Sequence, residues 1–267
     1  MKSLTIKELV LASDGNLLIG NENECIYDVV IDSRKASKEN VFVAIIGENL
    51  DGHKFIKSAY ENGCKTFIKN ESSSINLDSS DINLIEVKDT ALALGMIAKY
   101  YKEKFNIPYI GVTGSVGKTT TRDMIYATVS SKFDTLKNQG NLNNHFGVPL
   151  TLFNLNENYE CAVIEMGMSG FNEIKYLADI VNPGIGVISN IGLSHIENLG
   201  SQEGILKAKM EITTNFGPSN ILIVNGDDKL LSTLKDNNHN FILKTFGFDK
   251  DNDIYCESYD MGEEETK

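Results

Sequence analysis

Residues 109–121 read YIGVTGSVGKTTT, and this stretch decides the fold of the region that contains it. The apolar, branched residues at its start predict a short buried strand, and Gly114 and Gly117 predict a tight turn directly after that strand. From Lys118 onward, apolar residues recur at helical spacing through Val129. A strand, a glycine turn and a helix in this order predict a phosphate-binding loop.

The chemistry of this loop follows from its residue types. Glycines let backbone N–H groups approach phosphate oxygens, and the N-terminus of the helix adds positive potential. Lys118 can bridge the β and γ phosphates of ATP, and Thr119 can hold Mg²⁺. Val112 stands five positions before Gly117, where the common pattern has a glycine, so an ordinary glycine turn remains an alternative. The residues expected to bind the phosphates are Gly114, Ser115, Gly117, Lys118, Thr119 and Thr120.

Around this loop, strands alternate with helices from Pro108 onward, which is typical of a parallel sheet with crossover helices. Chemistry in such sheets lies at the carboxyl ends of the strands. We therefore predict an α/β, P-loop ATPase domain over 105–267, with a polar, acidic tail over Asp251–Lys267 that is either a frayed end or a cut. The candidate strands are short and rich in branched residues: Tyr109–Val112, Ala162–Glu165, Ile185–Ser189 and Ile221–Val224.

The first 104 residues predict a separate, small α/β domain. Two β-rich stretches flank a polar turn, and two segments have helical spacing, the second of them capped by Asp89. A polar stretch at 71–81 predicts an exposed loop. The predicted strands are Ile26–Asp32 and Val41–Ile46, and the predicted helices are His53–Asn62 and Asp89–Phe105.

Composition narrows the class of protein. A net charge of −12, from 25 Lys and Arg against 37 Asp and Glu, disfavours nucleic acid and anionic lipid as partners. No apolar run is long enough for a signal peptide or a membrane span, so we expect a cytoplasmic protein without a membrane partner. The cysteines form no CxxC pair, and we expect them to be reduced and structural: Cys25, Cys64, Cys161 and Cys256.

Three polar residues follow predicted strands of the second domain. Glu165 ends the run CAVIE, which favours a Mg²⁺ ligand beside the phosphate loop over a capping or surface carboxylate. His195 can bind metal, donate to phosphate or satisfy a loop carbonyl, and the residues alone leave these open. Asn225 ends the run ILIVN before a glycine, which is also typical of a simple turn.

At this point the chain resembles the Mur ligase family, whose phosphate loop has the shortened TGxxGKTT form present at Thr113–Thr120. In that family the departure at Val112 is a shared trait. GNLNN at 140–144 and GVPLT at 147–151 look like the member that adds D-alanyl-D-alanine. The resemblance covers nearly the whole chain, and its part in the first domain is DSR at 32–34, VFVA at 41–44, Gly47 and DGH at 51–53.

The resemblance implies roles for individual residues. It implies that the first domain binds a uridine nucleotide through Ser33 and Arg34, and that Asn225 contacts adenine. It assigns the sugar-peptide substrate to Asn141, Asn143 and Asn144, which alternatively only stabilise a tight loop. It also makes His195 a ligand of a second Mg²⁺. Lys209, 14 positions after His195, would be carbamylated by CO₂ and bind that ion like a long glutamate, with Lys207 as the competing lysine.

The resemblance further implies an ATP-dependent ligase of peptidoglycan synthesis. Lys118, Glu165, His195 and Lys209 would form the catalytic set, with Mg²⁺ bound by Thr119, Glu165, His195 and the carbamate. ATP would convert the carboxylate of UDP-N-acetylmuramoyl-tripeptide into an acyl phosphate, which the amine of D-alanyl-D-alanine attacks. The family has a third, C-terminal domain that helps to bind ATP. We therefore expect this chain, as a monomer of two domains, to bind the uridine-nucleotide substrate, to bind ATP weakly, and to turn over slowly or not at all.

Other functions compete with this one. The nearest are another ligase of the superfamily, either the Mur enzyme that adds the third amino acid or a folate polyglutamate ligase. GNLNN at 140–144, together with the first domain that contains DSR at 32–34, favours the D-alanyl-D-alanine-adding enzyme over both. A non-catalytic module that binds a uridine nucleotide is an alternative from another class. A P-loop GTPase is disfavoured, because the sequence has no Asn-Lys-x-Asp segment.

Overall fold

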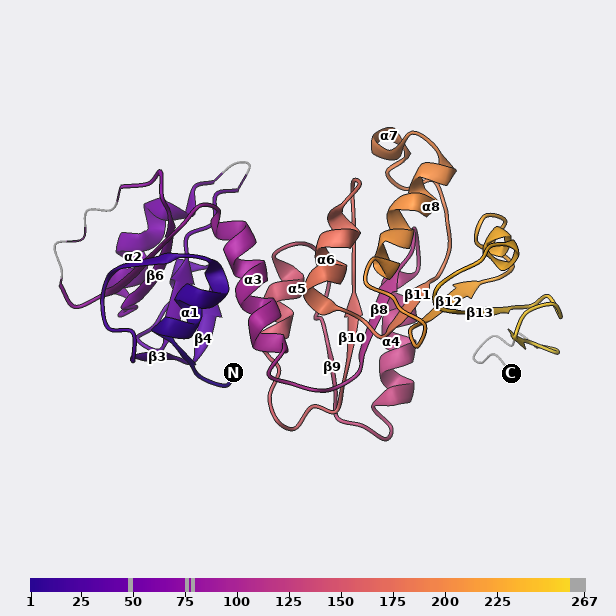
Figure 1. Cartoon of the computed structure of the whole chain (residues 1–267), viewed down its shortest axis with the longest axis horizontal. Coiled ribbons are helices and arrows are strands. Elements are labelled where there is room, and N and C mark those ends of the chain that lie inside the picture. Colours follow the sequence, from indigo (N-terminus) through magenta and orange to yellow (C-terminus); the bar gives the residue numbers. More distant parts are fainter. Residues whose placement is uncertain (48–49, 75–76, 78–79, 260–267) are drawn as a thin grey trace. The chain divides into compact units, whose positions relative to one another are not determined.

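The computed structural model describes residues 1–47, 50–74, 77 and 80–259, and it divides into two compact units (Figure 1). The first unit comprises Met1–Asn106 and His145–Asn158, and the second comprises Ile107–Asn144 and Tyr159–Lys267. The α/β class is confirmed. The sequence predicts a division after residue 104, with His145–Asn158 in the second domain, whereas in the structure this segment packs with the first unit.

The first unit is built on a mixed sheet. Its described residues form five strands in the order β2-β7-β6-β5-β4, with β2 antiparallel to β7 and the other neighbours parallel. Phe42 and Phe67, side by side on β5 and β6, are fully buried in its core. The strands are β2 Asn16–Ile19, β4 Asp28–Val30, β5 Asn40–Val43, β6 Thr66–Asn70 and β7 Asn83–Val87.

One predicted strand of this unit is wrong in its extent. The stretch Ile26–Asp32 is divided at Tyr27: β3 (Cys25–Ile26) pairs with β1 (Leu4–Thr5) in a small antiparallel sheet, whereas β4 pairs with β5. Because of this break, one apolar run contributes a strand to each of two sheets. The loop predicted at 71–81 lies between β6 and β7, and its residues 75–76 and 78–79 are outside the described part.

The helices of the first unit begin at capping residues that the sequence supplies. Thr5 and Glu8 form a reciprocal capping box at α1 (Ile6–Ser13). Asp89 caps α3 (Thr90–Lys102), as predicted, by accepting from the N–H groups of Ala91 and Leu92. The predicted helix His53–Asn62 starts as a 3₁₀ turn over Gly52–Phe55 and becomes α2 at Ile56–Glu61.

Packing explains why His145–Asn158 belongs to the first unit. Its helix α5 (Gly147–Leu152) contacts α3, and Phe153 lies 5.9 Å from the Tyr101 ring, centroid to centroid. The Tyr101 hydroxyl, which is fully buried, donates to the Leu155 carbonyl at 2.6 Å. A buried tyrosine needs such a partner for its hydroxyl, and this segment provides it.

The second unit is a doubly wound parallel sheet. Within the described range its strands follow the order β14-β13-β12-β11-β8-β10-β9, and every neighbouring pair is parallel. Strand β8 lies between β10 and β11, so the chain order reverses at its carboxyl end, where such folds bind ligands. The strands are β8 Tyr109–Thr113, β9 Thr135–Lys137, β10 Cys161–Glu165, β11 Ile185–Ile188, β12 Ile221–Asn225, β13 Ile242–Gly247 and β14 Ile254–Tyr255.

The four strands predicted here are confirmed to within one residue at each end, and β9, β13 and β14 were not predicted. Residues 260–267 of the predicted polar tail are outside the described part. The α-helices are α4 Lys118–Val129, α6 Glu173–Val181, α7 Ile196–Leu199 and α8 Gln202–Met210. Over the residues that the structure describes, no helix is both long and apolar enough to cross a membrane.

Candidate active site

The predicted phosphate loop lies at the carboxyl end of β8, at the switch point of the sheet. Gly117 has φ 74° and stands directly before α4, where no side chain caps the helix. The first N–H groups of a helix have no partner within the helix, so an uncapped N-terminus presents donors to an anion. Lys118 begins the helix, and its Nζ donates to the Ser115 carbonyl at 3.3 Å.

Two residues after β11 hold this loop in shape. The Ser189 hydroxyl donates to the Val116 carbonyl at 2.8 Å, and the Asn190 side chain bonds both the N–H and the carbonyl of Val116. Gly114 has φ 154°, and a Cβ atom there would lie 2.0 Å from the Ser189 hydroxyl oxygen. Position 114 therefore requires glycine, because the two segments touch.

Two buried hydroxyls of the loop lack partners. Thr113 Oγ1 and Ser115 Oγ are enclosed without any hydrogen-bond partner among the described residues. Buried polar atoms are normally hydrogen-bonded, so two neighbouring hydroxyls without a partner need an explanation. Phosphate oxygens or a hydrated cation would supply acceptors or donors for both, and the residues present therefore fit the phosphate end of a nucleotide.

Glu165 is the centre of a hydrogen-bonded network beside the loop. Its side chain is 1% exposed. One carboxylate oxygen accepts from the Thr119 hydroxyl at 3.0 Å and from Arg122 Nη1 at 3.2 Å, and the other accepts from Asn143 Nδ2 at 2.7 Å. The predicted proximity of Glu165 and Thr119 is confirmed, and a surface or helix-capping role for Glu165 is not what the geometry shows.

The asparagine-rich segment (residues 140–144) and Asn138 just before it also bond the backbone at the end of β10. Asn138, which is fully buried, accepts from the Glu165 N–H at 3.0 Å and donates to the Glu165 carbonyl at 2.9 Å. The Asn143 carbonyl accepts from the Gly167 N–H at 2.8 Å. Of the three predicted substrate residues, Asn143 donates to Glu165, and Asn141 and Asn144 are exposed.

Sequence reasoning missed Asn138 and Arg122. Arg122 is 3% exposed and bonds the Gly140 carbonyl, the Glu165 carboxylate and Asp123. A lone arginine in a helix and an asparagine before a loop carry no distinctive pattern. Their role becomes visible only when tertiary contacts are known.

Lys209 differs sharply from its competitor Lys207. Lys209 is 2% exposed, and burial lowers its pKa from 10.5 to about 7, with the charge of Lys118 adding to the effect. Lys207 is exposed and extends over the Phe171 ring, 5.9 Å from its centroid. Lys209 is therefore the lysine whose amine is partly uncharged near neutral pH.

His195 is not brought into contact with the other predicted metal ligands. It has φ 63° at the N-terminus of α7, and no described contact joins its ring to Glu165 or Lys209. Among the described residues, no group of three His, Cys, Asp or Glu side chains lies close enough to hold a metal ion. The complete ligand set from the sequence therefore stays a prediction.

Asn225 lies at the end of β12, where its side chain stabilises a turn. Its Oδ1 accepts from the Asp227 N–H at 3.0 Å. The following Asp228 accepts from the Ile191 N–H at 2.8 Å, which ties this turn to the segment after β11. The turn-stabilising role that the sequence left open is present, and adenine contact stays a prediction.

In the first unit, Ser33 and Arg34 begin a 3₁₀ turn after β4. Asp32 caps the turn and forms a two-pronged ion pair with Arg34, whose hydrogen bonds lower the Asp32 pKa to about 2. The Arg34 side chain is 86% exposed, whereas Ser33 is buried. Arg34 is therefore a fixed but accessible cation.

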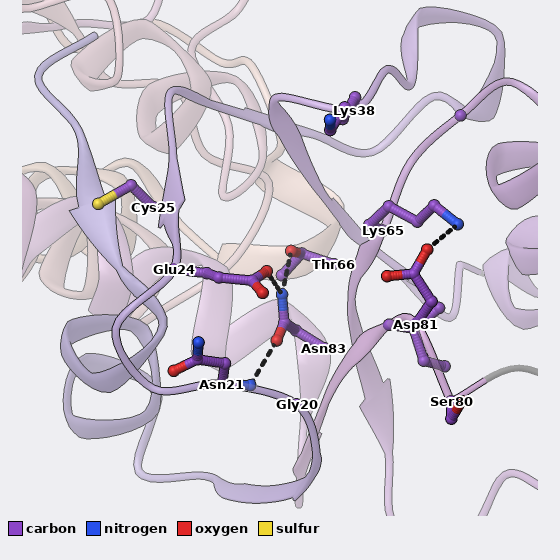
Figure 2. A pocket seen from close by; sticks show the side chains of 12 residues that line it. Gly20, Asn21, Glu24, Cys25, Lys38, Lys65, Thr66, Ser80, Asp81 and Asn83 are labelled. Atoms are coloured by element: carbon purple, nitrogen blue, oxygen red, sulfur yellow. Dashed lines mark hydrogen bonds and ion pairs between the residues drawn. The ribbon is translucent and has the colours of Figure 1, made fainter.

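A separate cleft of about 900 Å³ lies at the start of β6 and β7 (Figure 2). Its polar groups largely bond one another: Asn83 donates to Glu24 and Thr66, and Lys65 pairs with Asp81 at 2.9 Å. Neither Ser33 nor Arg34 lines it. This cleft is not among the predicted sites.

Comparison with known proteins matches both parts of the chain to domains of one family. The Mur ligase middle domain matches residues 112–267, and the catalytic domain of the Mur ligase family matches residues 26–102. Two solved structures align closely. One is MurF from Acinetobacter baumannii, with TM-score 0.89, 32% identity and coverage of 97% of this chain and 56% of that one. The other is MurF ligase from Thermotoga maritima in complex with ADP, with TM-score 0.80 and 30% identity. This alignment covers 90% of this chain and 54% of that one.

Among curated proteins, UDP-N-acetylmuramoyl-tripeptide--D-alanyl-D-alanine ligase from Bacillus subtilis (strain 168) is 40% identical over 245 residues, covering 92% of this chain and 52% of that protein. The protein of the same name from Synechocystis sp. is 38% identical and covers 85% and 49%. The chain spans about half the length of these relatives. With the middle-domain match extending over more than half of its residues, the chain belongs to the Mur ligase family.

Proposed function

We propose that this chain binds the ATP and the uridine nucleotide in a ligase reaction that joins D-alanyl-D-alanine to UDP-N-acetylmuramoyl-tripeptide for peptidoglycan. The observation that carries the proposal is the Glu165 network. It joins the phosphate loop, through Thr119, to the asparagine-rich segment, through Asn143. ATP and the sugar-peptide would thereby meet at one carboxylate. Relatives that are 35–40% identical and carry the name of this reaction support the substrate assignment.

Nucleotide binding falls to the loop and its neighbours. Backbone N–H groups from Gly114 to Thr120 face the phosphates, Lys118 neutralises part of their charge, and Asn225 contacts adenine. Thr119 and Glu165 would hold one Mg²⁺, and His195 with carbamylated Lys209 a second. Bound magnesium supplies positive charge that reduces the repulsion between the γ-phosphate and the acceptor carboxylate.

The reaction then proceeds in two substitutions. A carboxylate oxygen of the tripeptide attacks the γ-phosphorus of ATP, which forms the acyl phosphate and releases ADP. The amine of D-alanyl-D-alanine attacks the acyl carbon, the new C–N bond forms, and phosphate and a proton leave. Lys118 acts by placing fixed charge beside the transferred group. Asn141, Asn143 and Asn144 orient the sugar-peptide, whose carboxylate must lie in line with the phosphate.

The carbamate of Lys209, whose oxygens would bind Mg²⁺, forms by addition of the lysine amine to CO₂. The uncharged amine attacks the carbon of CO₂, one N–C bond forms, and one proton is released to give a carbamate. A pKa of about 7 leaves part of the amine uncharged at neutral pH, which this step requires. In the first unit, Ser33 and Arg34 bind the uridine diphosphate, for which the exposed Arg34 guanidinium supplies paired donors.

The proposal includes a cytoplasmic monomer, in keeping with four free cysteines that a reducing compartment would preserve.

Calorimetric titration with two acceptors tests the proposal. UDP-N-acetylmuramoyl-tripeptide is expected to bind at least about tenfold more tightly than the corresponding dipeptide, because the asparagine-rich segment contacts the peptide. Equal affinity for both would favour a module that recognises only the uridine nucleotide. Tighter binding of the dipeptide would favour the ligase that adds the third amino acid.

A further inference from the structure

Arg122 is a buried cation to which the proposed reaction assigns no role. It lies on α4 about one turn after Lys118, and its side chain is 3% exposed. A guanidinium in such a place is unfavourable unless it is paired and hydrogen-bonded. The partners of Arg122 therefore indicate what its charge does.

A single nitrogen of Arg122 connects three parts of the site. Nη1 donates to the Gly140 carbonyl at 2.9 Å and to Glu165 Oε2 at 3.2 Å. The other side of the guanidinium bonds Asp123 Oδ1, at 3.0 Å from Nε and 2.9 Å from Nη2. Helix α4, strand β10 and the start of the asparagine-rich segment are thus fixed to one another through this side chain.

The same contacts leave Glu165 with little unused capacity. A carboxylate has about four acceptor positions. Three side-chain donors already occupy Glu165: the Thr119 hydroxyl, the Asn143 amide and Arg122 Nη1. Of these, only Arg122 carries a charge, and it lies on the same oxygen as Thr119. A divalent cation that binds this oxygen meets the positive charge of Arg122 at close range.

We propose that Arg122 is a positioning residue that fixes Glu165 and lowers the affinity of this carboxylate for free divalent cations. The site then takes up its cation together with nucleotide phosphates, whose negative charge offsets the guanidinium. The electrostatic effect of a unit charge a few ångströms away in a buried site is large enough to change cation affinity by about tenfold or more. The inference rests on the metal-binding role proposed above for Glu165.

Titration of the full chain with Mn²⁺ alone, followed by calorimetry, tests this role. Arg122→Gln removes the charge but keeps a donor for the Gly140 carbonyl, and we expect its dissociation constant for Mn²⁺ to fall at least about tenfold. Arg122→Lys keeps the charge and should stay within about threefold of the native value. Lys137→Met is the matched control, because Lys137 bonds Asp123 at 2.8 Å and has no bond to Glu165.

If Arg122 were purely structural, Arg122→Gln would raise the dissociation constant for Mn²⁺, because a damaged site binds cations more weakly. Unchanged or weaker Mn²⁺ binding by Arg122→Gln would overturn the inference. If the Gln variant does not fold, as judged by circular dichroism, the Lys variant decides: native-like affinity supports the charge effect, and a tenfold change in either direction overturns it.

Titration with Mn²⁺ and ADP together separates this inference from the proposed function. If Glu165→Gln abolishes that binding while Arg122→Gln leaves Mn²⁺ affinity unchanged, the function stands and the inference fails. If Glu165→Gln binds Mn²⁺ and ADP like the native chain, the metal role of Glu165 fails and the inference with it.

Discussion

The two units differ in how far the charged residues of their candidate sites are buried. In the second unit, Glu165, Arg122 and Lys209 are almost fully buried and held by several partners or by packing. In the first unit, Arg34 is fixed by Asp32, yet 86% of its side chain is exposed. Buried charges have a rigid geometry, which suits a step in which charge develops. An exposed cation suits recognition of a phosphate that arrives from solvent.

The difference also concerns stability. An exposed ion pair contributes little to folding, whereas breaking a buried pair leaves a charge without a partner in a medium of low polarity. Substitutions of the buried charged residues of the second unit should therefore alter stability and binding together. Substitutions at Arg34 should alter binding only.

The largest effect is expected for Glu165→Ala, which breaks the buried ion pair with Arg122 and leaves Asp123 as the carboxylate that pairs with that guanidinium. The free energy of unfolding of the second unit should fall by about 3–5 kcal/mol. Urea denaturation followed by circular dichroism measures it, with Arg34→Ala as the exposed counterpart whose midpoint should not move. A small loss for Glu165→Ala would mean that the pair does not hold the network together.

The second-largest effect is expected for Lys118→Ala, which should weaken nucleotide binding without changing stability. Loss of a charged hydrogen bond to phosphate is worth about 1.5–3 kcal/mol, so affinity for a non-hydrolysable ATP analogue should fall by about tenfold to a hundredfold. The midpoint of urea unfolding should stay the same, because Lys118 is only partly buried and bonds a single carbonyl. Undiminished nucleotide affinity would remove the phosphate loop from the proposal.

Lys209 should give stability a dependence on pH. Its pKa is lowered from 10.5 to about 7 in the folded chain, so between those values the unfolded chain binds more protons. Stability contributed by this group is therefore lowest below pH 7 and rises as pH increases from 7 to 10.5. Urea midpoints across this range should rise less in Lys209→Met than in the native chain, whereas Lys207→Met should follow the native curve.

The smallest effect is expected for Asn143→Ala, which removes one of three side-chain donors to Glu165. We expect a loss of about 1 kcal/mol in the free energy of unfolding. The sugar-peptide should bind more weakly while the ATP analogue binds as before. Isothermal titration with each ligand checks this, and an equal loss for both would contradict a specific role toward the sugar-peptide.

Much of the second unit could be predicted from sequence because its central strands are continuous apolar runs next to glycine turns. Strand β9 is short and contains Thr135 and Lys137, and the apolar residues of β13 (ILKTFG) are interrupted by Lys244 and Thr245, so neither strand produces a long apolar run. The placement of His145–Asn158 depends on contacts with Tyr101 on α3, which no local pattern encodes.

The site was predictable where chemistry follows local spacing, and not where it depends on contacts between distant segments. The sequence predicts the phosphate loop and Glu165 because the loop follows one apolar strand and Glu165 ends another. Arg122 and Asn138 look ordinary in sequence, and only their bonds to Glu165 distinguish them. In the sequence, family resemblance alone points to Lys209, and the burial of this side chain gives a physical reason for that assignment.

Titration of two variants with two ligands tests most directly whether the second unit binds ATP and the first unit binds the uridine nucleotide. Lys118→Ala and Arg34→Ala would each be titrated with the ATP analogue plus Mg²⁺ and, separately, with UDP-N-acetylmuramoyl-tripeptide. We predict that Lys118→Ala loses affinity only for the ATP analogue and that Arg34→Ala loses affinity only for the uridine substrate. If neither ligand binds the native chain, or if each variant loses both ligands equally, the assignment of ATP to the second unit and the uridine nucleotide to the first is contradicted.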